Sequence, residues 1–185
     1  PLQTVKNYVI FVEVLGKDNN RDAQDLQDAC AHGFDQNWID DASFFDTAAA
    51  QDECWKIRED VAALEAHAPH NQHFDISIPI DKIGTIINNI IQQLQSLDGV
   101  LSVYPFGHVA DGNMHLIVGK QNDKPKLTRQ INEIVYQPLT SVKGSISAEH
   151  GIGLDKKPYL HLSRTHDEIH IMKGLKQLFD PKNIL

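Results

Sequence analysis

The chain has 185 residues, a net charge of −8 and a pI near 5.6, with 41% hydrophobic and 23% charged residues. This length fits one globular domain with a core of its own. The acidic balance, with no basic stripe, argues against a nucleic-acid partner. No apolar run approaches the roughly 18 residues of a membrane span, and "PLQTVKNYV" at the start lacks the apolar region of a signal peptide. We therefore do not expect an integral membrane protein.

The cysteines and the chain ends bear on the context of the protein. Cys30 and Cys54 form no CxxC pair, which favours a reducing compartment. We expect a cytoplasmic protein, or a mitochondrial one in a eukaryote. The chain starts at Pro1 rather than at a methionine and ends on "FDPKNIL", directly after a turn signal. We expect residues 1–185 to be a single domain of a longer protein.

The first half of the chain is predicted to alternate strands and helices. β-Branched and aromatic residues in "YVIFVEVLG" predict a strand over 8–16, and helical spacing predicts a helix over 18–34. "DDASFFD" favours a strand over 40–46. The Ala-rich segment that follows predicts a long helix over 47–69, ended by its proline. Alternation in "HFDISIPI" predicts a strand over 73–80.

The second half has a clear helical pattern at its start. Isoleucines and leucines recur at three- and four-residue steps, which predicts an amphipathic helix over 81–97. "GVLSVYPFGHVADGNMHLIVG" predicts strand, turn and strand over 99–119. Helices are expected over 124–144 and 164–180, with a Gly- and Ser-rich loop between them. The order predicts an α+β fold, a largely antiparallel sheet with helices packed on one face.

Two histidines of the predicted hairpin are candidates for a metal site. His108 and His115 lie on opposite arms of a tight connection, and residues that face each other across an antiparallel pair have Cβ atoms about 4.5–5.5 Å apart. Two imidazoles and a carboxylate such as Glu149 would form a three-ligand site with positions left open for substrate. The alternative is a pair of polar histidines that flank a surface turn.

Glu149 and His150 are adjacent in the loop "AEHGIG". Neighbouring side chains cannot point the same way from an extended backbone, so the two would serve different roles in one pocket. Glu149 would bind the metal, and His150 would face the substrate. The alternative is a solvated Gly-rich loop. Arg58, in "CWKIRED", could bind a substrate carboxylate as a bidentate fork or could pair with a neighbouring acid on the helix surface.

Together these segments resemble a known family. "FGHVADGNMH", "GSISAEHGIGLDKKPYL" and "FDPKNIL" occur in this order in the C-terminal domain of FAD-linked oxidases of the vanillyl-alcohol-oxidase type, and "LEAHAPHNQHFDISIPI" is similar to the family strand that leads into its next helix. The family includes D-lactate, glycolate and D-2-hydroxyglutarate dehydrogenases. The resemblance implies a cap domain with ferredoxin-like elements, which covers an FAD held mainly by an N-terminal domain that this chain lacks.

The resemblance also implies roles for individual residues. His108, His115 and Glu149 would hold a divalent metal, expected to be zinc, and His150 would take the proton from the 2-hydroxyl of the substrate. The hydride would pass to FAD. Arg58 matches an arginine that binds the substrate carboxylate, and His73 stands where the family has a substrate-binding lysine. Asn183 would lie close to the flavin.

Three departures from the hydroxyglutarate enzymes bear on the substrate. Ala62 replaces a threonine, His73 a lysine and Ile117 an asparagine, all of which help to hold the substrate in that group. A D-2-hydroxy acid other than a long diacid is therefore at least as compatible with the sequence.

The implied partners are a small D-2-hydroxy acid, the N-terminal FAD domain, an electron-acceptor protein or quinone, and a second copy of the chain in a homodimer. The isolated domain is expected to be inactive. Two other functions stay open at this stage, namely a flavin-independent metal-dependent hydrolase and a non-catalytic binding module.

Overall fold

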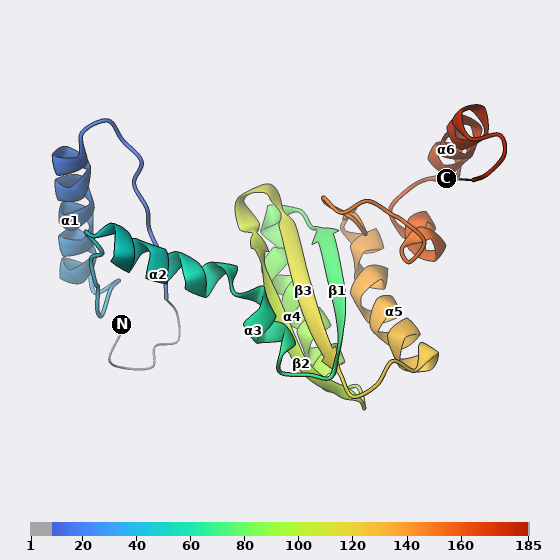
Figure 1. Ribbon diagram of the computed structural model, residues 1–185, viewed down its shortest axis with the longest axis horizontal. Coiled ribbons are helices and arrows are strands. Elements are labelled where there is room, and N and C mark those ends of the chain that lie inside the picture. Colours follow the sequence, from blue (N-terminus) through green and yellow to red (C-terminus); the bar gives the residue numbers. More distant parts are fainter. Residues whose placement is uncertain (1–8, 185) are drawn as a thin grey trace. The chain divides into compact units, whose positions relative to one another are not determined.

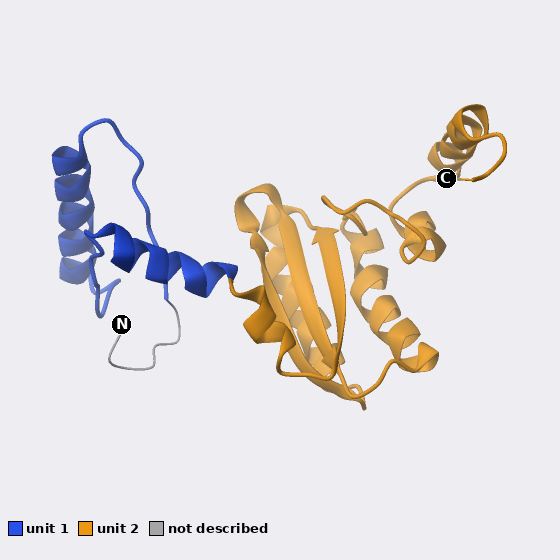
Figure 2. Ribbon diagram, viewed as in Figure 1, with its two compact units in different colours: residues 1–59 blue, residues 60–185 orange. Residues whose placement is uncertain are grey.

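The structure is a computed structural model that describes residues 9–184. The chain forms two compact units, residues 1–59 and residues 60–185 (Figure 2). Among the described residues, no helix is both long enough and apolar enough to cross a bilayer.

The first unit contains the helices α1 (Asn19–Asp35) and α2 (Ala48–Glu59). The side chain of Asp18 caps α1, because it accepts hydrogen bonds from the first free N–H groups of the helix. The strands predicted over 8–16 and 40–46 were wrong. Residues 9–16 and 41–46 form no strand, and residue 8 lies outside the described residues. Their β-rich composition was misleading because a strand forms only where another strand offers a hydrogen-bonded edge.

The single helix predicted over 47–69 is interrupted. After α2 the chain starts a new helix, α3 (Val61–Glu65), at the boundary between the two units. Asp60 causes the restart, because its side chain accepts a hydrogen bond of 3.0 Å from the Ala63 N–H and so caps α3. An Asp at a cap competes with the continuing helix.

The second unit confirms the predicted α+β class. Its three strands form one antiparallel sheet in the order β1-β3-β2 (Figure 1). The order of elements along the chain, βαββα, is the one found in ferredoxin-like folds. The elements are β1 (His70–Ser77), α4 (Ile83–Gln95), β2 (Val100–His108), β3 (Asn113–Lys120), α5 (Pro125–Ser141) and α6 (His166–Phe179), with short 3₁₀ segments at Ile80–Lys82, Val109–Asp111 and Lys157–Leu162.

One face of the sheet carries the hydrophobic core. The isoleucine stripe of α4 and the apolar side of α5 pack with alternate residues of β1 and β3. The core side chains of the two strands include Phe74, Ile76, Met114, Leu116 and Val118. Because side chains alternate along a strand, the residues between them point to the opposite face. That face carries the candidate site.

The chain after α5 returns beside β1. Ser77 and Ser145 exchange two backbone hydrogen bonds of 2.8 and 2.9 Å, as in an antiparallel bridge. A fourth strand of a ferredoxin-like sheet would continue from this bridge, but the next residues bend away as a loop. This loop contains Glu149 and His150.

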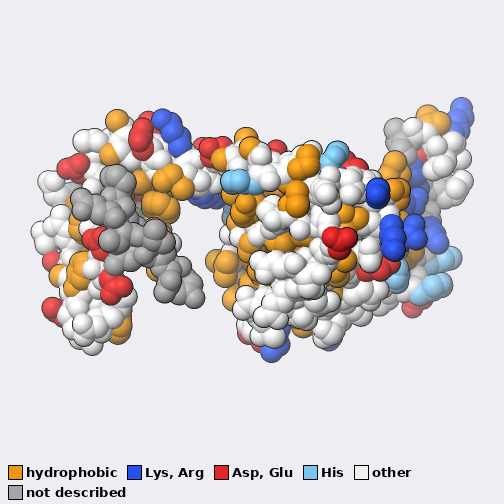
Figure 3. Space-filling model, turned by 90° about the horizontal axis from the view of Figure 1, so that it is seen from below, with side chains coloured by type: hydrophobic (Ala, Val, Ile, Leu, Met, Phe, Trp, Pro, Cys, Tyr) orange, Lys and Arg blue, Asp and Glu red, His pale blue; other side chains and the backbone are white. Residues whose placement is uncertain are grey.

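The last helix, α6, begins with a reciprocal capping box between Thr165 and Glu168. Several of its apolar side chains, including Ile171, Leu178 and Phe179, are exposed. Exposed apolar side chains occur in both units, as the orange atoms of the space-filling view show (Figure 3).

Candidate functional site

The sheet brings the two predicted metal histidines together on one face. His115 in the central strand β3 lies directly opposite Phe106, whereas His108 lies opposite Asn113. The prediction that His108 and His115 face each other was therefore wrong in register. They form a diagonal pair instead, and their ring centroids are 5.9 Å apart because long side chains still meet across a diagonal.

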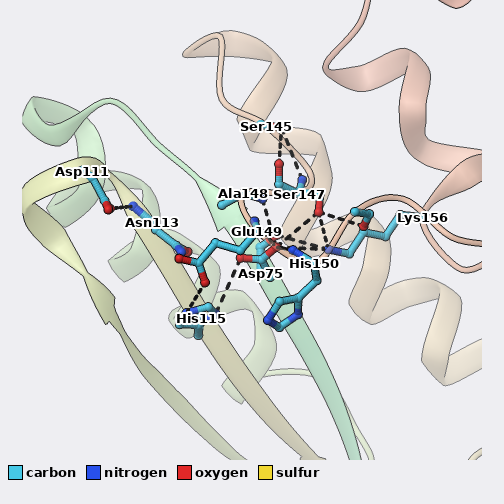
Figure 4. A network of polar contacts seen from close by, with 11 residues as sticks. Asp75, Asp111, Asn113, His115, Ser145, Ser147, Ala148, Glu149, His150 and Lys156 are labelled. Carbon is cyan, nitrogen blue, oxygen red and sulfur yellow. Dashed lines mark hydrogen bonds and ion pairs between the residues drawn. The ribbon is translucent and has the colours of Figure 1, made fainter. Parts of the chain in front are cut away.

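The loop after Ser145 adds the carboxylate and the third histidine. Glu149 Oε2 lies 4.0 Å from His115 Nε2, and the His150 ring stacks on the His115 ring with centroids 5.6 Å apart (Figure 4). One ligand atom from each of His108, His115 and Glu149 lies within 4.8 Å of the other two. The structure thus collects, from two separate segments, the residues that the sequence singled out for a metal.

A second group of three shares a member with the first. Ligand atoms of Asp75, His115 and His150 also lie within 4.8 Å of one another. His115 therefore stands between two carboxylates, Glu149 on its Nε2 side and Asp75 on its Nδ1 side. The hydrogen bonds of Asp75 bear on which of the two carboxylates would bind a metal.

Asp75 is fully buried and anchors the loop. Its Oδ2 accepts hydrogen bonds from the backbone N–H groups of Ala148, Glu149 and His150, at 3.0, 2.9 and 2.8 Å (Figure 4). The Ser147 hydroxyl lies 3.2 Å from the same oxygen. The other oxygen, Oδ1, has no hydrogen-bond partner and lies 3.7 Å from His115 Nδ1.

These contacts decide the charge of Asp75. Burial raises the pKa of the carboxyl, but the N–H groups of His150 and Glu149 and the nearby ammonium of Lys156 stabilise the carboxylate more strongly. The net effect lowers the pKa from 3.8 to about 2. Asp75 is therefore ionised at neutral pH although no solvent reaches it.

Lys156 supplies the opposite charge. Its Nζ lies 3.6 Å from Asp75 Oδ2 and donates a hydrogen bond of 3.0 Å to the Ser147 hydroxyl oxygen. Burial lowers the pKa of Lys156, and the Asp75 carboxylate opposes that shift. The pair keeps a charge of each sign beneath the loop, which is the arrangement that buried charges require.

A cavity of about 230 Å³ adjoins the histidines. Apart from His73, His115 and His150, the residues that line it are apolar, namely Val61, Phe74, Phe106, Leu116 and Ile117. A second, polar cavity of about 390 Å³ lies on the side of Glu149 and is lined by Ser77, Asp111, Asn113, Ser145, Ser147 and Arg164 among others. The two cavities flank the candidate metal ligands.

The remaining predicted site residues differ in where they lie. His73 lines the apolar cavity, where its Nε2 lies 3.1 Å from Glu65 Oε1. Arg58 belongs to the first unit, and its guanidinium lies 5.3 Å from the centre of the Trp55 ring. Asn183 has a left-handed backbone with φ of 51°, and its N–H donates to the Asp180 carbonyl. The roles of all three stay predictions.

Sequence reasoning missed Asp75 and Lys156. A signal for Asp75 was present, because Asp is depleted in strands and this one occupies a polar position of an alternating run, on the side opposite the core. For Lys156 no such signal exists, since one lysine among several in a polar loop has no distinguishing pattern.

The sequence of this chain is similar to those of known proteins. The family of FAD linked oxidases, C-terminal domain, matches over residues 1–185. A mitochondrial D-2-hydroxyglutarate dehydrogenase from Arabidopsis thaliana is 29% identical over 185 residues. A D-2-hydroxyglutarate dehydrogenase from Xanthomonas citri pv. viticola and a putative mitochondrial D-lactate dehydrogenase from Schizosaccharomyces pombe are each 31% identical.

The alignments cover this chain and the relatives to different extents. Each of the three covers 100% of this chain but only 33%, 40% and 37%, respectively, of the relative. The chain therefore spans between about a third and two fifths of the length of the curated relatives it matches. The match over every residue of the chain shows that it belongs to the family of C-terminal domains of FAD linked oxidases.

Proposed function

We propose that this chain is the substrate- and metal-binding domain of an FAD-dependent dehydrogenase that oxidises a D-2-hydroxy acid to a 2-oxo acid. The observation that carries the proposal is the convergence of His108, His115 and Glu149 beside His150, in a member of this family. The relatives are named as dehydrogenases of D-2-hydroxyglutarate and D-lactate, which are both D-2-hydroxy acids.

The donor set fits a divalent metal. Two imidazoles and one carboxylate with ligand atoms within 4.8 Å of one another are the donors that catalytic zinc takes, with a position left open for substrate. When bound there, zinc would supply a Lewis acid that lowers the pKa of a coordinated substrate hydroxyl. FAD, when bound, would supply the hydride acceptor.

His150 is the residue we assign to the proton. It is exposed, its ring stacks on His115, and its backbone is fixed by the hydrogen bond from its N–H to Asp75. A neutral imidazole is a suitable base for a hydroxyl proton near neutral pH. Glu149, the preceding residue, faces His115 Nε2 and so is left to the metal.

The apolar cavity bears on the substrate class. Phe106, Ile117 and Val61 offer no partner to a second carboxylate, and His73 is already paired with Glu65. Leaving a carboxylate without a partner among such side chains is costly. We infer that the substrate side chain is short or apolar, as in D-lactate, rather than a long acid. Arg58 stays a predicted contact of the substrate carboxylate.

The test uses the full-length protein, purified and checked for flavin absorption and bound metal. D-lactate, D-malate and D-2-hydroxyglutarate are added separately without oxygen, and loss of oxidised-flavin absorption is followed. We expect reduction by D-lactate, a large loss of rate in His150→Gln and none in His166→Gln, because His166 is an exposed residue of α6.

The other outcomes separate the alternatives. A protein without flavin that hydrolyses esters or phosphoesters in a zinc-dependent manner would replace the proposal with the metal-dependent hydrolase. A protein with neither flavin nor bound metal would favour the non-catalytic binding module. Reduction by D-2-hydroxyglutarate alone would keep the dehydrogenase and overturn the inferred substrate class. The electron acceptor, the homodimer and the compartment stay predictions.

A further inference from the structure

One buried carboxylate, Asp75, touches both segments that form the candidate metal site. We propose that Asp75 is a positioning residue. Its Oδ2 holds the loop that presents Glu149 and His150, and its Oδ1 selects the nitrogen with which His115 faces the metal. The inference rests on the metal site of the proposed function but concerns a residue that the proposed chemistry does not use.

The first part of the inference follows from the loop contacts. Three consecutive N–H groups, of residues 148, 149 and 150, converge on the single oxygen Oδ2. No strand pairs with this segment, so its N–H groups have no sheet carbonyls to bind. Leaving a partly buried N–H group without an acceptor is costly, and these three find their acceptor in the carboxylate. The carboxylate therefore determines where the backbone of Glu149 and His150 lies.

The second part follows from the orientation of the His115 ring. Its Nδ1 lies 3.7 Å from Asp75 Oδ1, and its Nε2 lies 4.0 Å from Glu149 Oε2. A neutral imidazole has one protonated nitrogen and one with a lone pair. A proton on Nδ1 faces the carboxylate, and the lone pair of Nε2 then faces the candidate metal position. Metal-binding histidines commonly donate their other N–H to a carboxylate in this way.

The free oxygen of Asp75 supports this assignment independently. Oδ1 is buried and has no hydrogen-bond partner, whereas Oδ2 is surrounded by donors. The 3.7 Å separation from His115 Nδ1 is longer than a hydrogen bond, and a ring movement of under an ångström would close it. His115 is thus the residue best placed to satisfy this oxygen.

Asp75 also belongs to the second group of three potential ligands, with His115 and His150. If Asp75 bound the metal directly, His150 would be a ligand and would no longer be free to take a proton. The donors around Oδ2 leave only one oxygen for such a bond. We therefore assign the metal to the group with Glu149, and the experiment distinguishes the two assignments.

The first test is the zinc affinity of Asp75→Asn in the full-length protein, measured by competition with a chromophoric chelator. The asparagine carbonyl can still accept from the loop N–H groups, but its NH₂ then faces His115 and favours the tautomer with the proton on Nε2. We expect zinc binding to weaken about 10- to 100-fold. Asp123→Asn is the matched control, because Asp123 is a half-exposed surface residue paired with Lys120.

The outcomes have separate meanings. Zinc affinity in Asp75→Asn within about threefold of the wild type overturns the positioning role. Complete loss of zinc from a folded Asp75→Asn, with zinc kept in Glu149→Gln, identifies Asp75 as a ligand and also overturns it. Absence of zinc binding in the wild type contradicts the proposed metal site instead.

A second measurement needs no variant of Asp75, so it stands even if Asp75→Asn does not fold. Long-range ¹H–¹⁵N correlation spectra of the metal-free protein, labelled at histidine, report which ring nitrogen carries the proton. They are recorded at about pH 8.5, two units above the usual histidine pKa of roughly 6.5. His115 is assigned by the signal lost in His115→Gln. We expect the proton on Nδ1, and a proton on Nε2 would refute the inference whether or not zinc binds.

Discussion

Acid should destabilise the second unit through Asp75, because its pKa is lower in the folded chain than in the unfolded one. A carboxyl with a lowered pKa contributes its full stabilisation above its unfolded pKa of 3.8. That contribution is lost as the pH falls through the folded value of about 2. Between these two values the unfolded chain binds a proton that the folded chain does not. The free energy of unfolding therefore decreases as the pH decreases.

The size of the effect follows from the shift. Lowering the pKa from 3.8 to about 2, at about 1.4 kcal/mol per pH unit, corresponds to about 2 kcal/mol. Solvent screens this contribution little, because the side chain of Asp75 is 0% exposed. A surface carboxylate in an ion pair would contribute less than about 1 kcal/mol.

The assay is urea unfolding of the metal-free protein, followed by far-ultraviolet circular dichroism at several pH values between about 5 and about 2.5. The free energy of unfolding of Asp75→Asn is subtracted from that of the wild type, so that the other carboxyls cancel. We expect the difference to shrink by about 1–2 kcal/mol across this range. A difference that stays constant with pH would show that the loop N–H groups do not stabilise an ionised Asp75.

Three further predictions concern the core, the last helix and the cavity. Leu116→Ala should lower the free energy of unfolding by about 2–5 kcal/mol in urea titrations, whereas Leu101→Ala, on an exposed strand position, should change it by less than about 0.5 kcal/mol. Thr165→Ala removes the capping box of α6 and should destabilise that helix by about 1 kcal/mol, measured by amide hydrogen exchange. The double change of Ile117→Asn and His73→Lys adds polar partners for a second carboxylate to the apolar cavity. It should therefore raise kcat/KM for D-2-hydroxyglutarate relative to D-lactate. An unchanged ratio of the two kcat/KM values would contradict the role assigned to this cavity.

Local patterns predicted the second unit well, whereas in the first unit they predicted the helix α1 correctly and two strands wrongly. The isoleucine stripe of α4 and the alternation in β1 arise from one buried face, which the spacing of apolar residues reports directly. The segment over 8–16 has a strand-like composition, but whether it pairs depends on another segment, which its own residues do not encode. The cap at Asp60 was missed because the Ala-rich residues around it have high helix propensity on both sides.

The residues of the candidate site also differ in whether the local sequence reveals them. His108, His115, Glu149 and His150 stand in short motifs whose residue types suggested their chemistry, and the fold brings them together. Asp75 contacts residues 72 to 75 positions later in the chain. A contact over this separation has no periodicity or motif, so only the return of the chain beside β1 makes it visible.

The candidate site gives a reason why the segment after Ser145 is a loop and not a fourth strand beside β1. In a strand, Glu149 and His150 would point to opposite faces of the sheet, and only one of them could reach His115. As a bent loop, the segment brings Glu149 Oε2 to 4.0 Å from His115 Nε2 and the His150 ring to 5.6 Å from the His115 ring. The loop loses the ladder of hydrogen bonds that a strand would have, and Asp75 replaces three of them with one buried oxygen. The buried carboxylate therefore holds two adjacent residues beside His115 in the candidate site.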